Sequence, residues 1–246
     1  MPASLGAGGC QLHVGTKADA ESEIPNGGDA EHSTVLGVDL GIEQIAVSST
    51  GRFWSGDYLR HRRREYERIR GSLQQTGTES AHRTIERMSG RETRWVKDYL
   101  HRISKEIIEE AVVNDCDIIA FEDLTDIGER LPTGKKFQNW AFHRLYEYVS
   151  YKAETEGIEV RQVDPAYTSK RCSRCGSISD GNRPSQAKFS CQECGYQVQA
   201  DYNAAKNIGI RLLRGRQKSS HGGATRHLAL KSGTLSVNGE YSPASG

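Results

Sequence analysis

The sequence predicts a mixed α/β fold, and three observations lead to this class. Short β-branched apolar runs alternate with stretches of helical period between residues 34 and 214. The strand-like runs come first as a group of three and then singly, each separated by a helical stretch, which is typical of α/β and α+β domains. Two C-x2-C pairs stand just before the last helical stretch, which indicates a small metal-stabilised module at that place.

The first three strands of the predicted sheet lie close together in the chain. The stretch "STVLGVDLG" (33–41) is apolar and contains Asp39 near its end, and "EQIAVSS" (43–49) alternates apolar and polar residues. The stretch "GRFWS" (51–55) follows across a turn at Thr50-Gly51. We therefore expect three strands in a meander.

A long helical region follows, from about residue 57 to residue 114. Its second half places apolar residues near one helix face, as packing against a sheet requires; they are Trp95, Tyr99, Ile103, Ile107 and Val112. Gly71, Gly77 and Gly90 interrupt the region, so we expect two helices with a loop between them.

The later elements alternate. "CDIIAFEDL" (116–124) is a buried strand that ends in Glu122, and "NWAFHRLYEYVSYKAETEG" (139–157) is an amphipathic helix closed by its glycine. "IEVRQVDP" (158–165) is another strand, and "DYNAAKNIGIRLLRG" (201–215) is the last helix. We expect these strands to join the sheet in parallel through helical crossovers.

Polar segments flank this pattern. Residues 1–33 are rich in Gly, Ser and acids and predict a disordered leader, and residues 215–246 predict a flexible tail. The expected α/β domain comprises residues 34–165 and 201–214, and the module that carries the two cysteine pairs spans residues 166–200. No apolar run approaches the roughly 18 residues of a membrane span, and the start of the chain lacks secretory-signal features, so we expect a cytoplasmic protein without a membrane partner.

Positive charge is clustered even though the net charge is only +1. Residues 161–218 contain eleven Lys or Arg and four Asp or Glu, a balance of +7, whereas residues 1–33 have a balance of −4. Clustered cations bind phosphates, and the candidates are Arg60, Arg62, Arg63 and Arg64 in the first helical stretch, with Lys170, Arg171 and Arg174 beside the cysteines. A solvated helix face is the alternative for the arginine run.

Four of the six cysteines have the spacing of a zinc ribbon. Cys172, Cys175, Cys191 and Cys194 form two C-x2-C pairs separated by fifteen residues, and each pair is followed by glycine. Four thiolates without an open position indicate a closed, structural Zn²⁺ site. Disulfides or a redox pair are the alternatives, but nothing indicates the secreted setting that disulfides need. Cys116, beside a predicted strand, is expected to be a packed small hydrophobe.

Three carboxylates occupy positions that suit a second metal site. Asp39 lies in the first strand, Glu122 ends the fourth, and Asp201 opens the last helix. If strands one and four are neighbours and the last helix packs over them, the three acids meet, and Mg²⁺ or Mn²⁺ would relieve their repulsion. Each also has a plainer explanation: a turn with Gly41 for Asp39, solvent exposure for Glu122 (with Asp123 as the functional acid), and the helix dipole for Asp201.

Four stretches, taken together, resemble a known family. "GVDLGIEQIAVSSTG", "IIAFEDL", "YKAETEGIEVRQVDPAYTSKRCSRCG" and "CQECGYQVQADYNAAKNI" are similar to the TnpB or OrfB family of transposon proteins, over about residues 34–214. The resemblance implies a RuvC-like nuclease domain of ribonuclease H-like fold, with helices on both faces of a mixed sheet and a zinc ribbon inserted before the last helix. By its pattern Asp39, Glu122 and Asp201 are the catalytic acids, and the four cysteines are the zinc ligands.

The same resemblance implies an activity and partners. Proteins of this family are RNA-guided DNA endonucleases, related to the type V CRISPR effectors, that use two metal ions and leave a 5′-phosphate and a 3′-hydroxyl. DNA and a guide RNA are the expected partners. Members of the family carry a large N-terminal portion that binds the guide RNA, whereas only about 33 residues precede the first predicted strand here, so we expect an N-terminally truncated member. A catalytically inactive, zinc-stabilised binding protein, surviving as a transposon remnant or regulator, is the alternative. A Holliday-junction resolvase fits less well, because such enzymes present a fourth acid and do not usually carry this ribbon.

Overall fold

The computed structural model describes residues 32–123, 125, 136–215, 225–230, 233–236 and 241–243. The predicted leader lies outside the described residues up to residue 31, as do several stretches of the predicted tail and Cys10. None of the described helices is long and apolar enough to cross a membrane.

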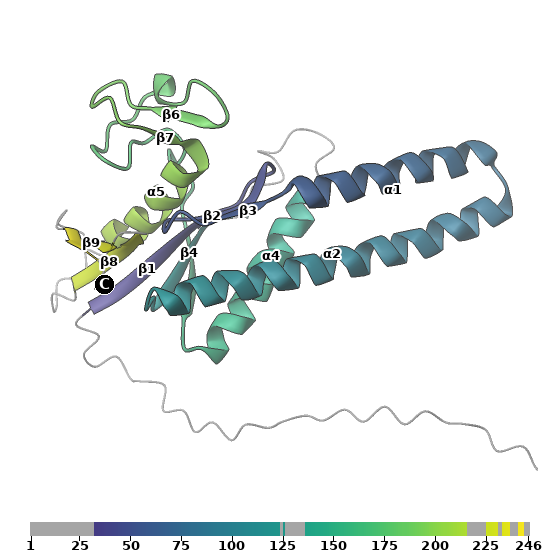
Figure 1. Ribbon diagram of the computed structural model, residues 1–246, viewed down its shortest axis with the longest axis horizontal. Coiled ribbons are helices and arrows are strands. Elements are labelled where there is room, and N and C mark those ends of the chain that lie inside the picture. The colour runs from purple at the N-terminus through teal and green to yellow at the C-terminus, as the bar shows by residue number, and fades with distance from the viewer. Residues whose placement is uncertain are drawn as a thin grey trace, which may run out of the picture. The chain divides into compact units, whose positions relative to one another are not determined.

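The centre of the structure is a mixed sheet (Figure 1). Strands β1 (His32–Asp39), β2 (Gln44–Ser48) and β3 (Phe53–Ser55) form the expected antiparallel meander. Strand β4 (Ile118–Glu122) pairs in parallel with β1, and β5 (Glu159–Val163) pairs in parallel with β4. The predicted parallel joining of the later strands is therefore confirmed.

Two long helices, α1 (Asp57–Thr76) and α2 (Glu79–Val113), follow the meander and lie side by side (Figure 1). Of the three glycines expected to interrupt this region, only Gly77 does so, because its left-handed φ of 63° ends α1. Thr78 then caps α2 by accepting a hydrogen bond of 3.2 Å from the amide of Ala81. The other two glycines lie inside the helices, which tolerate single glycines at a modest cost.

Helices cover both faces of the sheet. Because side chains alternate along a strand, Leu36 and Val38 pack with α2 and with α4 (Lys136–Thr155), whereas Val35 packs with α5 (Ala200–Gly215). The predicted face of α2 is largely right, since Ile103 and Ile107 are buried. Val112 is the exception, because it is 46% exposed and Ala111 is buried in its place.

The prediction of a flexible tail is wrong for part of residues 215–246. Residues Thr225–Leu230 form strand β8, which pairs in parallel with β1 and continues to β9 (Gly233–Ser236) and β10 (Tyr241–Pro243). Leu228 is fully buried against α5 and β1, and the hydroxyl of Ser49 donates to the carbonyl of Ala229 at 2.8 Å. The short run "HLAL" is flanked by polar and Gly-rich sequence, so its pattern alone is too weak to indicate a strand.

Glycines allow α5 to cross β1 closely. A Cβ added to Gly37 would stand 2.1 Å from the carbonyl oxygen of Ala205 and 2.8 Å from the amide nitrogen of Gly209. Both atoms belong to the backbone, so the helix itself would have to move. The first turn of α5 is thereby held near the end of β1.

Gly37→Ala is expected to lower the free energy of unfolding by about 3 kcal/mol, because overpacking against backbone cannot be relieved by a rotamer change. Urea unfolding followed by circular dichroism measures this. Gly71→Ala is the matched control: its added Cβ would meet nothing within 4 Å, and it should stabilise α1 by up to about 1 kcal/mol. Equal stability of the two variants would contradict the close crossing.

Candidate active site

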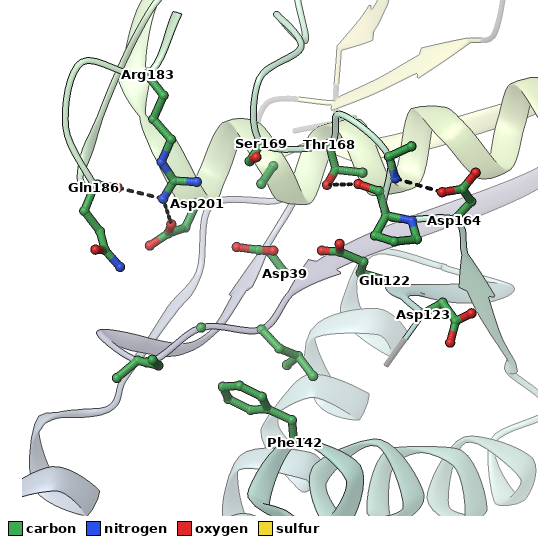
Figure 2. A pocket seen from close by; sticks show the side chains of 16 residues that line it. Asp39, Glu122, Asp123, Phe142, Asp164, Thr168, Ser169, Arg183, Gln186 and Asp201 are labelled. Atoms are coloured by element: carbon green, nitrogen blue, oxygen red, sulfur yellow. Dashed lines mark hydrogen bonds and ion pairs between the residues drawn. The ribbon is translucent and has the colours of Figure 1, made fainter. Parts of the chain in front are cut away.

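Three acidic side chains converge at one edge of the sheet. Asp39 and Glu122 are the last residues of β1 and β4, and the register that pairs Val38 with Phe121 brings the ends of the two strands together. Asp201 lies in the first turn of α5, directly over that edge. All three line a cleft of about 550 Å³, and Figure 2 shows the Asp39 carboxylate between those of Asp201 and Glu122.

The electrostatics of the cleft favour a cation. The pKa of Asp39 is raised well above its usual range, first by burial and then by the charges of Asp201 and Glu122, with Arg183 opposing them. Asp39 therefore lies close enough to Asp201 and to Glu122 to be repelled by both carboxylates. Carboxylate oxygens are the ligands that Mg²⁺ and Mn²⁺ prefer. This donor set, in which the repulsion is relieved only in part by one arginine, fits such a cation.

Arg183 is a component of this cleft that the sequence patterns did not reveal. It follows the 3-10 helix η1 (Asp180–Asn182) within the predicted ribbon, and its Nη2 donates to Asp201 Oδ1 at 3.1 Å and to the Gln186 carbonyl at 2.8 Å (Figure 2). Gln199 Nε2 donates to the other oxygen of Asp201 at 3.0 Å. These two donors hold the Asp201 carboxylate in one orientation. The only sequence signal was an arginine midway between the cysteine pairs.

Two further acids line the cleft. Asp123 accepts hydrogen bonds from the amide and the hydroxyl of Thr125, at 2.9 and 2.6 Å. Asp164 pairs with Arg211 at 2.7 Å. Between the neighbours Glu122 and Asp123, Glu122 is the one whose charge raises the pKa of Asp39. Figure 2 also shows the Glu122 carboxylate beside Asp39 and the Asp123 carboxylate farther away, so the structure favours Glu122 over Asp123 as the partner of Asp39.

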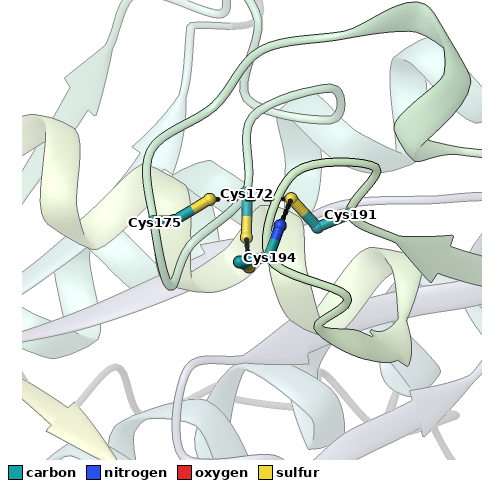
Figure 3. Close-up of side chains that lie close together, drawn as sticks. All are labelled: Cys172, Cys175, Cys191 and Cys194. Atoms are coloured by element: carbon teal, nitrogen blue, oxygen red, sulfur yellow. Dashed lines mark hydrogen bonds between the residues drawn. The ribbon is translucent and has the colours of Figure 1, made fainter.

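The four predicted zinc ligands come together in a second cluster (Figure 3). All four sulfur atoms lie within 4.8 Å of one another, and the pairs Cys172–Cys194 and Cys175–Cys191 have Sγ–Sγ distances of 3.7 and 3.6 Å. These distances are far longer than the roughly 2.05 Å of a disulfide. They match the edge of a tetrahedron with Zn–S bonds of about 2.3 Å, which is about 3.8 Å. The cluster therefore fits Zn²⁺.

Backbone groups of the cluster favour the thiolate form of Cys191, whereas burial raises the pKa of the Cys172 thiol. The amide of Cys194 donates to Cys191 Sγ at 3.5 Å and lowers the pKa of the Cys191 thiol to about 7. Gly176 and Gly195 have φ of 82° and 68° and turn the chain back, so that their amides donate to the carbonyls of Cys172 and Cys191. Outside the cluster, Cys116 is buried as predicted, and burial raises the pKa of its thiol to about 12.

The cysteine cluster is joined directly to the start of α5. The paired strands β6 (Lys188–Ser190) and β7 (Gln197–Gln199) lead into the helix, and Ala200 packs with Phe189 in the small core of the module. The side chain of Asn203 accepts from the amide of Ser173 at 3.0 Å and donates to the carbonyl of Arg171 at 2.8 Å. The position of Asp201 thus depends on the packing of this module.

The structure places the basic residues predicted to bind nucleic acid in different surroundings. Arg60 pairs with Glu43 and Asp57, Arg62 with Glu65, Arg63 with Glu67 and Glu92, and Lys170 with Asp180. Arg64 and Arg174 are exposed, and Arg171 lines a second pocket. A solvated helix face would form the same intramolecular ion pairs. The contact of these residues with nucleic acid therefore stays a prediction.

Comparison with known families gives two matches in succession along the chain. Residues 21–127 match a family model described as a probable transposase, of the OrfB type. Residues 142–208, which include the four cysteines, match the TNB domain of Cas12f1-like proteins.

Individual relatives agree with these matches. A Cas12f1 endodeoxyribonuclease of Syntrophomonas palmitatica is 32% identical over 220 residues, covering 71% of this chain and 44% of the relative. A TnpB-like protein of Methanocaldococcus jannaschii is 39% identical over 131 residues, covering 50% of this chain and 45% of the relative.

A solved structure, described as a Cas12f1–sgRNA–target DNA complex, superimposes with a TM-score of 0.61 and 23% identity, over 71% of this chain and 49% of that one. This likeness shows the RuvC-like fold. The chain spans less than half the length of the two curated relatives above. By its two family matches and its relatives, the chain belongs to the TnpB/OrfB family and is Cas12f-like.

Proposed function

We propose that this chain is a metal-dependent DNA endonuclease whose catalytic cations are held by Asp39, Glu122 and Asp201. The observation that carries the proposal is the convergence of these carboxylates from β1, β4 and α5 on one cleft, with the pKa of Asp39 raised first by its burial and then by the charges of the other two. The names of the relatives support the reaction class, since Cas12f1 is named as an endodeoxyribonuclease.

The residues of the chain have separate tasks in this proposal. Asp39, Glu122 and Asp201 would hold two divalent cations, which would supply the activation of a water for in-line attack on the phosphodiester and the stabilisation of the leaving oxygen, to give a 5′-phosphate and a 3′-hydroxyl. Asp39 and Glu122 present their oxygens from the rigid ends of paired strands. Arg183 and Gln199 fix the orientation of Asp201. The four cysteines hold a structural Zn²⁺ that takes no part in the chemistry.

A cleavage assay tests the proposal. The purified, zinc-loaded chain is incubated with labelled single-stranded DNA and Mn²⁺, beside Asp39→Ala. Cleavage by the wild type, with 5′-phosphate ends and loss of activity in the variant, is the expected result. Binding without cleavage by both proteins would instead support a non-catalytic, zinc-stabilised nucleic-acid-binding protein.

We extend the guide RNA and target DNA of the solved relative to this chain as candidate partners. Nucleic acid that co-purifies with the chain, digested separately with ribonuclease and deoxyribonuclease, distinguishes the two. An RNA-free preparation that still cleaves DNA would show that cleavage does not need a guide.

A further inference from the structure

A second pocket lies beside the candidate active site, across a single loop. It has a volume of about 310 Å³, and residues 166–168 and 171 supply one wall while α5 supplies the other. Ala166 and Thr168 line both this pocket and the cleft that holds Asp39. The two pockets therefore share a wall, and a polymer bound in the cleft could reach the second pocket with its next few units.

The pocket is lined by three arginines. Arg211 is already engaged, with Asp164 at 2.7 Å and the carbonyl of Ala166 at 2.7 Å. Within the part of the chain that the structure describes, neither Arg171 nor Arg214 pairs with an acidic side chain. Burial, followed by the charges of Arg214 and Arg211, lowers the pKa of Arg171. The three cations repel one another, and an anion in the pocket would relieve that repulsion.

Asn207 lines the pocket and carries a buried hydrogen-bond acceptor. The side chain is 3% exposed, and its Nδ2 donates to the carbonyls of Thr168 and Arg171 at 2.8 and 2.6 Å. Because both partners are acceptors, the amide orientation is determined and Oδ1 must point the other way. Among the described residues this Oδ1 has no hydrogen-bond partner, although it is buried. A buried acceptor without a partner is costly, so a ligand that supplies a donor would be favoured here.

Tyr167 supplies an aromatic surface in a strained position. Its φ is 63°, in the left-handed region that a bulky residue avoids, and its side chain is 60% exposed. The loop keeps this conformation because the amide of Arg171 donates to the carbonyl of Tyr167 at 2.9 Å. An exposed tyrosine at the rim of a cationic pocket is a surface on which a planar base can stack.

We propose that this second pocket binds one nucleotide of a single-stranded nucleic acid that passes through the neighbouring cleft. Arg171 and Arg214 take the phosphate, Tyr167 stacks on the base, and Asn207 Oδ1 accepts from a base amino group or a sugar hydroxyl. The proposal rests on the proposed function only in taking nucleic acid as the ligand. A free phosphate would satisfy the arginines but would leave the aromatic ring and the buried acceptor unused.

The test measures binding without cleavage. Asp39→Ala chains are titrated with a fluorescent single-stranded oligonucleotide at several salt concentrations, and anisotropy gives the dissociation constant. Arg171→Gln/Arg214→Gln should weaken binding roughly tenfold at low salt and reduce the slope of log K against log salt by about 0.7, the value for one lost phosphate contact on a single strand. Arg91→Gln/Lys105→Gln, which removes two exposed charges on α2, is the control and should have at most a small effect.

A second variant separates the base contact from the charge. Tyr167→Gly removes the ring, relieves the left-handed strain, and should weaken binding about tenfold. An abasic strand should bind the protein that retains Tyr167 about tenfold more weakly than the intact strand does, and removing the bases should weaken binding by the glycine variant clearly less. Unchanged zinc content and circular dichroism confirm that each variant is folded.

Three results would overturn the proposal. The arginine variant could bind the strand as tightly as its control does. Removing the bases could weaken binding by the same factor with and without Tyr167. Inorganic phosphate could displace the strand, which would assign Arg171 and Arg214 to a free anion. Because binding is measured in a cleavage-deficient chain, these results are independent of the cleavage assay. A catalytically inactive wild type that still shows the expected binding pattern would refute the proposed function and leave the pocket intact.

Discussion

Asp39→Asn is expected to abolish DNA cleavage and, in the same protein, to raise stability at neutral pH when no divalent cation is present. Asparagine keeps the shape of the side chain but removes a charge that burial, Asp201 and Glu122 all disfavour. Cleavage should fall on the order of a thousandfold or more, the scale seen when an essential catalytic group is removed. The free energy of unfolding should rise by about 1 to 2 kcal/mol, as is common when a functional site is relieved of strain.

The stability of the wild type and of Asp39→Asn should also depend differently on pH. The folded-state pKa of Asp39 is raised above the unfolded value of about 3.9, so the folded protein binds the proton more tightly than the unfolded chain. The favourable contribution is complete below about pH 4 and is lost as pH rises through the raised folded-state pKa. Without divalent cations, the wild type should therefore lose stability over that range, and Asp39→Asn should lose less.

Urea unfolding between pH 4 and pH 8, with and without Mg²⁺, measures both effects. Mg²⁺ should stabilise the wild type by mass action and should have little effect on the asparagine variant. Asp117→Asn is the control, because Asp117 lies at the opposite end of the sheet, where it accepts from the amide of Thr34 at 2.8 Å. A wild type as stable as Asp39→Asn at pH 8 in the absence of cations would show that the three carboxylates do not interact in solution.

The sequence predicts those parts of the fold that depend on local pattern. Alternation and β-branched runs locate β1, β2 and β4, and the parallel crossover then brings the ends that carry Asp39 and Glu122 together. The cysteine cluster follows from spacing alone, because a tetrahedral site tolerates few loop lengths. What these predictions share is that short segments determine them.

The sequence is weaker where a contact between distant segments decides the outcome. Strand β8 forms by pairing with the edge of β1, and the sequence of residues 225–230 does not reveal that this edge is available. Arg183 reaches Asp201 only because the cysteine module folds over the start of α5. The arginines of α1 form a basic run in the sequence, whereas in space Arg63 and Arg70 meet Glu92, a residue of α2 more than twenty positions away.

Cys191→Ser is the second prediction with a large expected effect: loss of bound zinc together with loss of cleavage. Cys191 is 3% exposed and packs with Phe189 and Ala200, so its thiolate anchors both the metal and the small core that precedes α5. Serine is a poor zinc ligand, and three thiolates hold the ion much more weakly than four. Cleavage at saturating Mn²⁺ should fall about a hundredfold, although none of the three catalytic acids is altered.

The reason for this coupling is the route from the cysteines to Asp201. Arg183 lies between the two cysteine pairs, and Gln199 ends the strand that leads into α5, so both donors to the Asp201 carboxylate belong to the zinc-stabilised module. When the module unfolds, Asp201 loses its orientation. The α/β domain should remain folded, because the cores on the two faces of its sheet are separate from the small core around the cysteines.

Zinc content by atomic absorption, cooperative unfolding by circular dichroism and the rate of DNA cleavage are measured on the same preparation. Cys116→Ser is the matched control: Cys116 is also buried, but it lies outside the cluster, so this variant should lose some stability and keep both zinc and cleavage. Arg183→Ala should keep zinc and lower cleavage, because it removes the hydrogen bond to Asp201 and leaves the four cysteines unchanged. If zinc-free Cys191→Ser cleaved DNA at the wild-type rate, the module would have no part in positioning Asp201, and the contact with Arg183 would be incidental to the reaction.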